Sequence, residues 1–180
     1  MSDAQPNSLD LRAGLGRGQA PETANMMFFQ CAPEPKTINR VARVLVIEDH
    51  PFIRESVVRL INRQPDMTCC GHADSIAMAP DVAAEQRPDL VLMDLRLKDG
   101  DSFGLLEFLQ IQTPGLPIVM FSNSDELEVA ERALRSGARG YVLKNEVGEE
   151  VLRALQIALH GKMYVSNDLA GRLLQKLLRS

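Results

Sequence analysis

The chain has 180 residues and a formal net charge of −4, from 20 Lys and Arg residues against 24 Asp and Glu residues. This length fits one hydrophobic core with tails, and the negative charge excludes a general attraction to nucleic-acid phosphates. No apolar stretch has membrane-spanning length and the N-terminus lacks a secretory-signal pattern, so we expect a cytoplasmic protein with no membrane contact.

Residues 1–40 are rich in Gly, Pro, Ser, Asn and Gln and show no sustained hydrophobic period. This composition predicts a disordered extension. Its one apolar patch is Met26-Met27-Phe28-Phe29. The patch could form a short helical turn without a function, or it could dock on the domain or on a partner.

Residues 41–161 alternate between short apolar runs and helical patterns, which favours parallel βαβ units in one α/β domain. Pro51 suits a first helical position, Pro80 makes the second helix start late or kink, and Gly137 caps the fourth helix. We predict strands over residues 41–47, 67–71, 90–93, 118–121 and 140–143, and helices over residues 51–62, 75–86, 102–110, 125–135 and 146–160.

The three cysteines are Cys31, Cys69 and Cys70, and they form no CxxC pair. Two adjacent cysteines in a strand point to opposite faces of the sheet. We therefore expect buried structural thiols in a reduced compartment, in preference to metal ligands or disulfides.

Residues 162–180 are predicted to form a linker and a C-terminal amphipathic helix, which Ser166, Asn167 or Asp168 can cap. Five leucines fall on one face of this helix, at positions 169, 173, 174, 177 and 178. An exposed leucine stripe usually packs on another surface. That surface could be the domain itself, a second copy of the chain or a further domain.

Four of the apolar runs end on residues that can handle a phosphoryl group: Glu48 and Asp49, Asp94, Ser122, and Lys144. In an open α/β sheet, ligands bind outside the carboxyl ends of the strands, where all of these residues would lie. Carboxylates packed together repel one another, so the cluster needs a proton or a cation among them. Mg²⁺ is the natural cation, because it binds oxygen ligands and leaves a position for a phosphate oxygen.

We expect Asp49 and Asp94 to be direct Mg²⁺ ligands and Glu48 to bind directly or through water. The backbone carbonyl of Arg96 would complete the set. Asp94 stands at the tip of the central strand, where its carboxylate can attack phosphorus in line.

Phosphoryl transfer requires positioning and neutralisation of charge on three equatorial oxygens. Mg²⁺ can neutralise one, the Lys144 ammonium another, and the Ser122 hydroxyl with backbone N–H groups the third. The new phosphate adds roughly −1.5 to −2 charges. It should draw Ser122 inward and let Tyr141 turn inward, and so switch the face formed by residues 125–135, 140–143 and 146–160.

The set Glu48-Asp49, Asp94, Ser122, Tyr141 and Lys144 resembles the receiver domain of bacterial two-component response regulators, over about residues 43–160. This resemblance implies a flavodoxin-like (βα)5 sheet with strand order 2-1-3-4-5 and dependence on Mg²⁺. It also implies phosphorylation of Asp94 by a sensor histidine kinase or a histidine phosphotransfer protein.

Three further segments are most similar to the receiver subgroup that is fused to a LuxR-type helix-turn-helix: Asp-His-Pro after the first strand, Gly-Ala-Arg-Gly-Tyr-Val-Leu-Lys around the fifth, and Gly-Lys-Met-Tyr-Val-Ser after the fifth helix. That subgroup continues into a DNA-binding domain, whereas this sequence ends at Ser180 after the final helix. Arg172, Lys176 and Arg179 are a thin basic footprint, so DNA binding is not expected from this chain alone.

The first functional hypothesis is a signalling switch that is not a conventional enzyme and that binds a downstream protein or relays its phosphoryl group. A homodimer is one of the assemblies open to it. The alternative is a truncated or fragmentary DNA-binding transcriptional response regulator. An aspartate-nucleophile phosphatase ranks lower, because Arg96 stands where such enzymes usually have a second acid. A nucleotide-binding Rossmann domain ranks lower still, since no Gly-rich loop follows the first strand.

Overall fold

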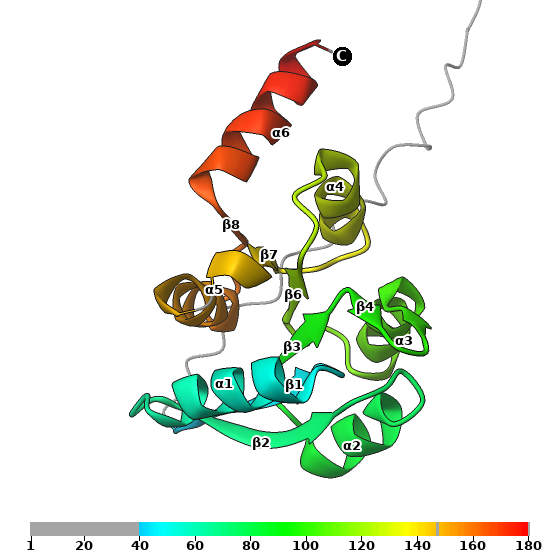
Figure 1. Ribbon diagram of the computed structural model, residues 1–180, viewed down its shortest axis with the longest axis vertical. Helices are drawn as coiled ribbons and strands as arrows, with labels where there is room; N and C mark the ends of the chain where they lie inside the picture. Colours follow the sequence, from blue (N-terminus) through cyan, green and yellow to red (C-terminus); the bar gives the residue numbers. More distant parts are fainter. Residues whose placement is uncertain (1–39, 147, 180) are drawn as a thin grey trace, which may run out of the picture. The chain divides into compact units, whose positions relative to one another are not determined.

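The computed structural model describes residues 40–146 and 148–179, and within them one six-stranded parallel sheet forms the centre of the fold (Figure 1). The strand order is β2-β1-β3-β6-β7-β8, with β1 Ala42–Ile47, β2 Met67–Ala73, β3 Leu90–Asp94, β6 Ile118–Ser122, β7 Gly140–Leu143 and β8 Tyr164–Val165. The first five strands have the predicted flavodoxin-like order, which confirms the expected fold class. The sixth, β8, was not predicted, because two residues carry no readable period.

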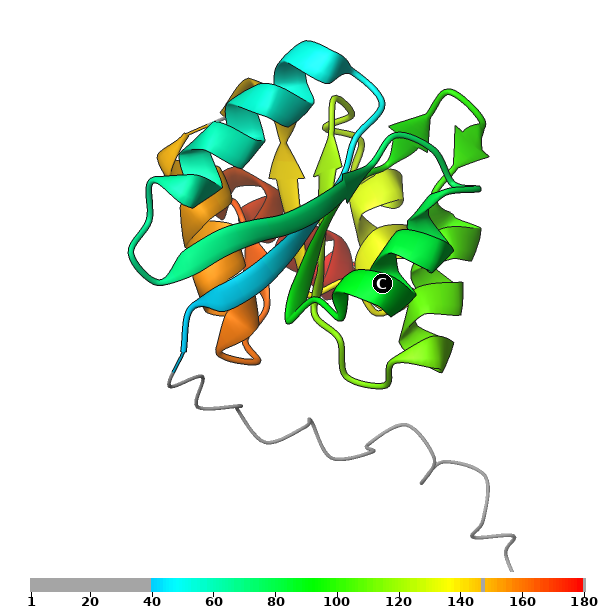
Figure 2. The ribbon, with the colours of Figure 1, turned by 90° about the horizontal axis from the view of Figure 1, so that it is seen from below.

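Helices cover both faces of the sheet (Figure 2). On one face, α1 (Pro51–Asn62) and α5 (Glu149–Leu159) bury Val57, Ile61, Val151 and Leu155 against the strands. On the other face lie α2 (Ala79–Gln86), α3 (Phe103–Gln112) and α4 (Leu127–Arg135). Apolar residues on both sides of each inner strand explain the continuous apolar runs in the sequence.

Local sequence signals set the ends of the helices. Pro51 is the first residue of α1, and Pro80 is the second residue of α2, which starts late, as one of the two predicted outcomes. Gly137 follows α4 with a φ of 99°, and its N–H donates to the Leu134 carbonyl, as a helix C-cap requires. Helix α5 begins at Glu149, later than predicted, because residues 144–146 form a 3₁₀ turn first.

The loop after Asp94 contains a small antiparallel pair, β4 (Arg96–Leu97) and β5 (Gly100–Asp101). The Asp99 carboxylate accepts hydrogen bonds from the backbone N–H groups of Ile76 (3.0 Å) and Ala77 (3.1 Å). These bonds hold the loop after β3 against the loop after β2, and so fix the surroundings of the Asp94 strand end.

Cys69 and Cys70 are free thiols on β2, and they contribute to opposite core clusters, as the alternation of a strand predicts. Both are only partly buried on β2, an edge strand, so the expectation of buried structural thiols is confirmed only in part for them: each packs against the core, and neither is fully enclosed. Burial still raises the pKa of both thiols. Cys31 and the Met26-Met27-Phe28-Phe29 patch of the expected extension lie outside the described residues.

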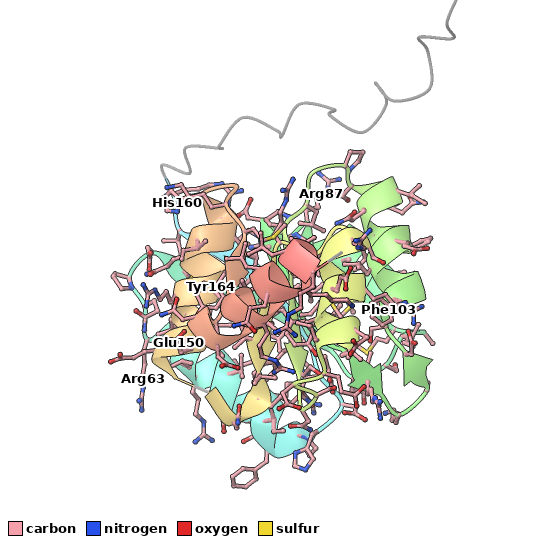
Figure 3. All side chains as sticks on the ribbon, turned by 90° about the horizontal axis from the view of Figure 1, so that it is seen from above. Arg63, Arg87, Phe103, Glu150, His160 and Tyr164 are labelled. Carbon is pink, nitrogen blue, oxygen red and sulfur yellow. The ribbon has the colours of Figure 1, made fainter. Side chains whose placement is uncertain are left out.

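The C-terminal helix α6 (Asn167–Arg179) packs back on the domain beside α4 (Figure 3). Leu169 is buried in the cluster that α2, α3 and α4 share, and Leu173 packs against it. Leu174, Leu177 and Leu178 are exposed. Only the first part of the predicted leucine stripe therefore packs on the domain.

No helix within residues 40–146 and 148–179 combines the length and the apolar character needed to cross a bilayer.

Candidate functional site

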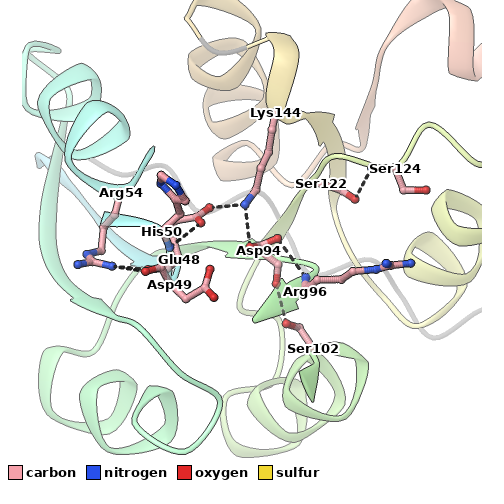
Figure 4. A network of polar contacts seen from close by, with 10 residues as sticks. All are labelled: Glu48, Asp49, His50, Arg54, Asp94, Arg96, Ser102, Ser122, Ser124 and Lys144. Carbon is pink, nitrogen blue, oxygen red and sulfur yellow. Dashed lines mark hydrogen bonds and ion pairs between the residues drawn. The ribbon is translucent and has the colours of Figure 1, made fainter. Parts of the chain in front are cut away.

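The carboxyl ends of the central strands bring the predicted polar residues to one edge of the sheet (Figure 4). Glu48 and Asp49 follow β1, Asp94 is the last residue of β3, and Lys144 follows β7. One carboxylate oxygen from each of the three acids lies within 4.8 Å of the others. Ser122, the last residue of β6, ends the neighbouring strand. The juxtaposition follows from the parallel arrangement of the strands.

Lys144 lies between two of the carboxylates. Its Nζ is 2.7 Å from Glu48 Oε2 and 2.7 Å from Asp94 Oδ2, and its side chain is 6% exposed. Burial raises the pKa of both Glu48 and Asp94 above the ordinary values, although the ammonium of Lys144 opposes this shift. The charged forms of both acids are therefore disfavoured unless another cation joins them.

The donor set fits a hard divalent cation. With all groups ionised, three carboxylates and one ammonium leave two excess negative charges. Glu48 Oε2 is buried and has no well-oriented hydrogen bond from the described residues; its close neighbour is the Lys144 ammonium. Within the same part of the chain, no hydrogen bond or ion pair engages the Asp49 carboxylate. Oxygen ligands at this spacing suit Mg²⁺.

Backbone groups around Asp94 are also bound. The N–H of Arg96 donates to Asp94 Oδ1 at 3.0 Å, so the backbone of Arg96 lies next to the carboxylate. The Ser102 hydroxyl, which is fully buried, donates to the backbone carbonyl of Asp94 at 2.6 Å. These two bonds fix both the side chain and the main chain at the end of β3.

Sequence reasoning missed two residues of this region, Ser102 and Arg54. Arg54 Nη1 donates to the backbone carbonyls of Glu48 at 2.7 Å and Asp49 at 3.3 Å. The signal available in the sequence was an arginine one helical turn past the start of α1, from where a long side chain can reach back to the preceding loop.

Ser122 and Tyr141 both contact Ser124 in the loop before α4. The N–H of Ser124 donates to Ser122 Oγ at 3.0 Å, and the Tyr141 hydroxyl donates to the Ser124 carbonyl at 2.8 Å. The Tyr141 ring is already buried, in the cluster that contains the small residues Ala130 and Ala133 of α4. The Tyr141 ring thus points inward in this conformation, and its turn on phosphorylation stays a prediction.

A hollow of about 360 Å³ opens beside the acidic cluster, lined by Asp94, Arg96 and residues 122–126. A larger groove, of about 570 Å³, lies between α2 and α3 and is lined by Pro80, Arg87, Phe108 and neighbouring residues. The smaller hollow adjoins the carboxylates and the larger one does not. A group that reacts with the Asp94 carboxylate can therefore bind in the smaller hollow.

This fold and this site define a response regulator receiver domain, and the family model of that description matches residues 44–156. The chain belongs to this family. Among curated relatives, it is 37% identical over 128 residues to the nitrate/nitrite response regulator protein NarL of Escherichia coli (strain K12), covering 71% of this chain and 59% of the relative. It is 31% identical over 137 residues to the DNA-binding transcriptional activator DevR/DosR of Mycobacterium tuberculosis, covering 76% and 63%.

Solved structures agree with these sequence relatives. A two-component response regulator of the LuxR family from Aurantimonas sp. SI85-9A1 superposes with a TM-score of 0.73 at 28% identity, over 77% of this chain and 99% of that one. The receiver domain of a putative response regulator NarL from Mycobacterium tuberculosis gives 0.64 at 28% identity, over 68% and 99%. The predicted similarity to the LuxR-type subgroup is thus confirmed, while the chain spans about three fifths of the curated relatives' length.

Proposed function

We propose that this chain is a cytoplasmic, phosphorylation-controlled receiver that accepts a phosphoryl group on Asp94. Response regulators are signalling proteins, and phosphoryl-transfer signalling is their general function. The observation that carries the proposal is the Asp94 carboxylate itself: it ends the central strand, contacts Lys144 and opens onto a hollow. The donor would be a phosphohistidine of a sensor histidine kinase or of a histidine phosphotransfer protein.

In this reaction one Asp94 oxygen forms a bond to phosphorus while the phosphorus–nitrogen bond of the donor breaks and the imidazole leaves. Glu48, Asp49, Asp94 and the Arg96 carbonyl would hold Mg²⁺, which when bound neutralises charge on a phosphoryl oxygen. Lys144 would move its ammonium from the carboxylates to a second phosphoryl oxygen. This division of roles is supported by the composition of the cluster, in which three carboxylates are accompanied by a single ammonium, that of Lys144.

Ser122 would serve the third oxygen and start the switch. Its Oγ accepts a hydrogen bond from Ser124 N–H, and rotation toward a phosphoryl group would break that bond. The Tyr141 hydroxyl holds the carbonyl of the same residue, and α4 begins at Leu127. A moved loop would therefore shift α4 and change the face formed by α4, β7 and α5, which we propose as the surface for a downstream protein partner.

The domain boundaries belong to the same proposal. We assign residues 41–161 to the receiver and residues 162–180 to a linker and helix that docks back on it. A homodimer is compatible with this division, and its formation would be read from the oligomeric state before and after phosphorylation.

The second candidate is a DNA-binding transcriptional regulator of which this chain is one part. It is favoured by the relatives' lengths, of which the chain spans 59% and 63%. Of the three basic residues of α6, Lys176 pairs with Glu131 of α4 (2.7 Å), and Arg172 pairs with Asp168 within α6 itself (3.8 Å). A duplex-binding assay at moderate salt should therefore detect no sequence-specific nanomolar binding by residues 1–180; such binding would favour the second candidate.

The proposal is tested by intact mass after incubation with acetyl phosphate and Mg²⁺. We expect the wild type and Asp81→Asn, which changes an exposed aspartate of α2, to gain the mass of one phosphoryl group. Asp94→Asn should gain none. Equal uptake by Asp94→Asn, or no uptake by the wild type, would overturn the proposal. Turnover of a phosphate ester for many cycles per protein would favour a phosphatase instead.

A further inference from the structure

The short loop that carries two of the three clustered acids is held from behind by an arginine. Only residues 48–50 separate the end of β1 from the start of α1. Arg54, in the first turns of α1, donates from Nη1 to the Glu48 carbonyl at 2.7 Å and to the Asp49 carbonyl at 3.3 Å. Its own N–H donates to the His50 carbonyl at 3.0 Å. One residue thus binds every carbonyl of the loop.

The other hydrogen bonds of this loop do not engage the Glu48 and Asp49 carbonyls. Glu48 N–H donates to the Ala73 carbonyl of β2 at 3.0 Å, and His50 N–H donates to Glu48 Oε1 at 3.1 Å. The second bond restrains the Asp49–His50 peptide through its N–H, and it leaves the Glu48 and Asp49 carbonyls to other donors. Repulsion between the Asp49 and Asp94 carboxylates acts to push this peptide outward. The guanidinium of Arg54 opposes that movement by binding the carbonyls on both sides of the Asp49 nitrogen and α-carbon.

Arg54 differs from Lys144 in the atoms that it contacts. Lys144 binds the carboxylate oxygens of Glu48 and Asp94, and so competes with any other cation for them. The Arg54 guanidinium donates its hydrogen bonds to main-chain oxygens, on the other side of the loop from Lys144 (Figure 4). The carboxylate oxygens stay free to bind a metal ion, while the positive charge still lies close to the loop.

We propose that Arg54 is a positioning residue for the divalent cation: by clamping the Glu48 and Asp49 carbonyls, it holds the Asp49 carboxylate at the distance from Asp94 that a single ion can bridge. The inference rests on the proposed Mg²⁺-dependent function of the same cluster. Residues that orient metal ligands without touching the metal typically change affinity by 10- to 100-fold when they are removed. Arg54 belongs to this class.

The test compares Mg²⁺ affinity in Arg54→Gln with that in Arg59→Gln. Arg59 lies on the same helix, is largely exposed and pairs with Glu55, so its replacement removes the same charge away from the loop. Mg²⁺ would be titrated at constant ionic strength and followed by amide chemical shifts of residues 48–50 and 94–96. We expect Arg54→Gln to raise the Kd by about tenfold and Arg59→Gln to change it by less than about twofold.

A second measurement separates positioning from general damage to the fold. Phosphorylation of Arg54→Gln by acetyl phosphate should be slow at limiting Mg²⁺ and should return to the wild-type rate at saturating Mg²⁺, because the clamp acts on ion binding and not on the nucleophile. Arg54→Lys, which keeps the charge and can reach one carbonyl, should give an intermediate Kd. The urea midpoint of each variant reports its folding.

The outcomes are separable. If the wild type binds no Mg²⁺, the proposed function itself fails. If the wild type binds Mg²⁺ and both folded Arg54 variants bind it equally well, only the positioning role is overturned. Should Arg54→Gln fail to fold, the Kd of Arg54→Lys decides. Loss of folding in both variants would assign Arg54 to stability and would also overturn the role.

Discussion

Two lysines of this chain each lie between two carboxylates, and their surroundings differ. Lys144 Nζ is 2.7 Å from Glu48 Oε2 and 2.7 Å from Asp94 Oδ2, and no side chain of the three is more than 6% exposed. There burial dominates, and it raises the pKa of both acids despite the ammonium. The buried arrangement is costly, because it holds three carboxylates with one ammonium, and we propose that a further cation joins it.

The second arrangement joins α4 to α6 at the surface. Lys176 Nζ is 2.7 Å from Glu131 Oε2 and 3.6 Å from Glu128 Oε1, and the Lys176 side chain is 41% exposed. The hydrogen bond between Lys176 and Glu131 lowers the pKa of Glu131 and raises that of Lys176. The same residue types therefore form an ordinary surface ion pair where water screens them, and acids with raised pKa values where burial does not allow screening.

The largest effect is expected from breaking the buried arrangement. Lys144→Gln leaves Glu48 and Asp94 facing each other without an ammonium, and we expect it to lower the free energy of unfolding by about 3 kcal/mol at pH 7. The loss should shrink as the pH is lowered toward about 4.3, because protonation removes the repulsion. Urea denaturation measures both. Equal losses in Lys144→Gln and Lys176→Gln would contradict the comparison.

Removing one buried carboxylate should have the opposite effect on stability from removing the Lys144 ammonium. Without divalent cations, Glu48→Gln should be more stable than the wild type by about 1 kcal/mol at pH 7. Since burial raises the pKa of Glu48, the folded wild type holds this proton to higher pH than the unfolded chain does. The stability of the wild type relative to Glu48→Gln should therefore fall as the pH rises from about 4.

Mg²⁺ supplies the control for that experiment. It should stabilise the wild type more than Glu48→Gln, because ligand binding to the folded state adds stability according to its affinity. Thermal unfolding with and without Mg²⁺, at matched ionic strength, measures the difference. An identical gain in both proteins would remove Glu48 from the cation site.

Tyr141 connects the two regions, because its hydroxyl binds the loop that leads into α4. Tyr141→Phe should lower the free energy of unfolding by about 1 kcal/mol and leave phosphorylation of Asp94 intact. The amide chemical-shift changes that phosphorylation causes in α4 and α6 should become smaller. Tyr164→Phe, the matched change of the tyrosine on β8, should leave them unchanged; a wild-type response in Tyr141→Phe would contradict a coupling role.

The smallest effect is expected at the surface. Since the folded-state pKa of Glu131 is lowered, its stabilising contribution is present above the unfolded value of about 4.3 and is lost as the pH falls below it. Amide hydrogen exchange in α6 should speed up in that range, and Glu131→Gln should speed it up at neutral pH. Glu55→Gln, which removes an exposed carboxylate of α1, should not.

The sequence predicted the sheet and the acidic edge well, because both depend on local patterns. Continuous apolar runs located the inner strands, and the polar residue at the end of each run, such as Asp94, located the edge. Other features depend on tertiary packing. The Tyr141 ring lies in the same buried cluster as Ala130 and Ala133 of α4, which belong to another part of the chain, so no pattern within its own strand predicts this packing. The role of Arg54 could not be predicted either, because it binds backbone carbonyl oxygens, which every residue has and no sequence motif marks.

The same distinction explains the C-terminal segment. Helix α6 and its leucine face were readable from the 3.6-residue period. The surface on which it packs was not, because β8 is only two residues long and the pairing of Lys176 with Glu131 joins positions 45 residues apart. Local periodicity specifies an element, whereas its partner is decided by the finished fold.

The contact of α6 with α4 has a thermodynamic corollary. If a phosphoryl group on Asp94 and docked α6 disfavour each other, the two equilibria are linked, and each must shift the other by the same factor. A protein that captures α6 away from the domain would then tighten the binding of a phosphoryl mimic at Asp94 as much as the mimic loosens α6. The fraction of docked α6 would then depend on whether Asp94 is phosphorylated, and a partner bound to α6 would change the affinity of the Asp94 site for a phosphoryl mimic.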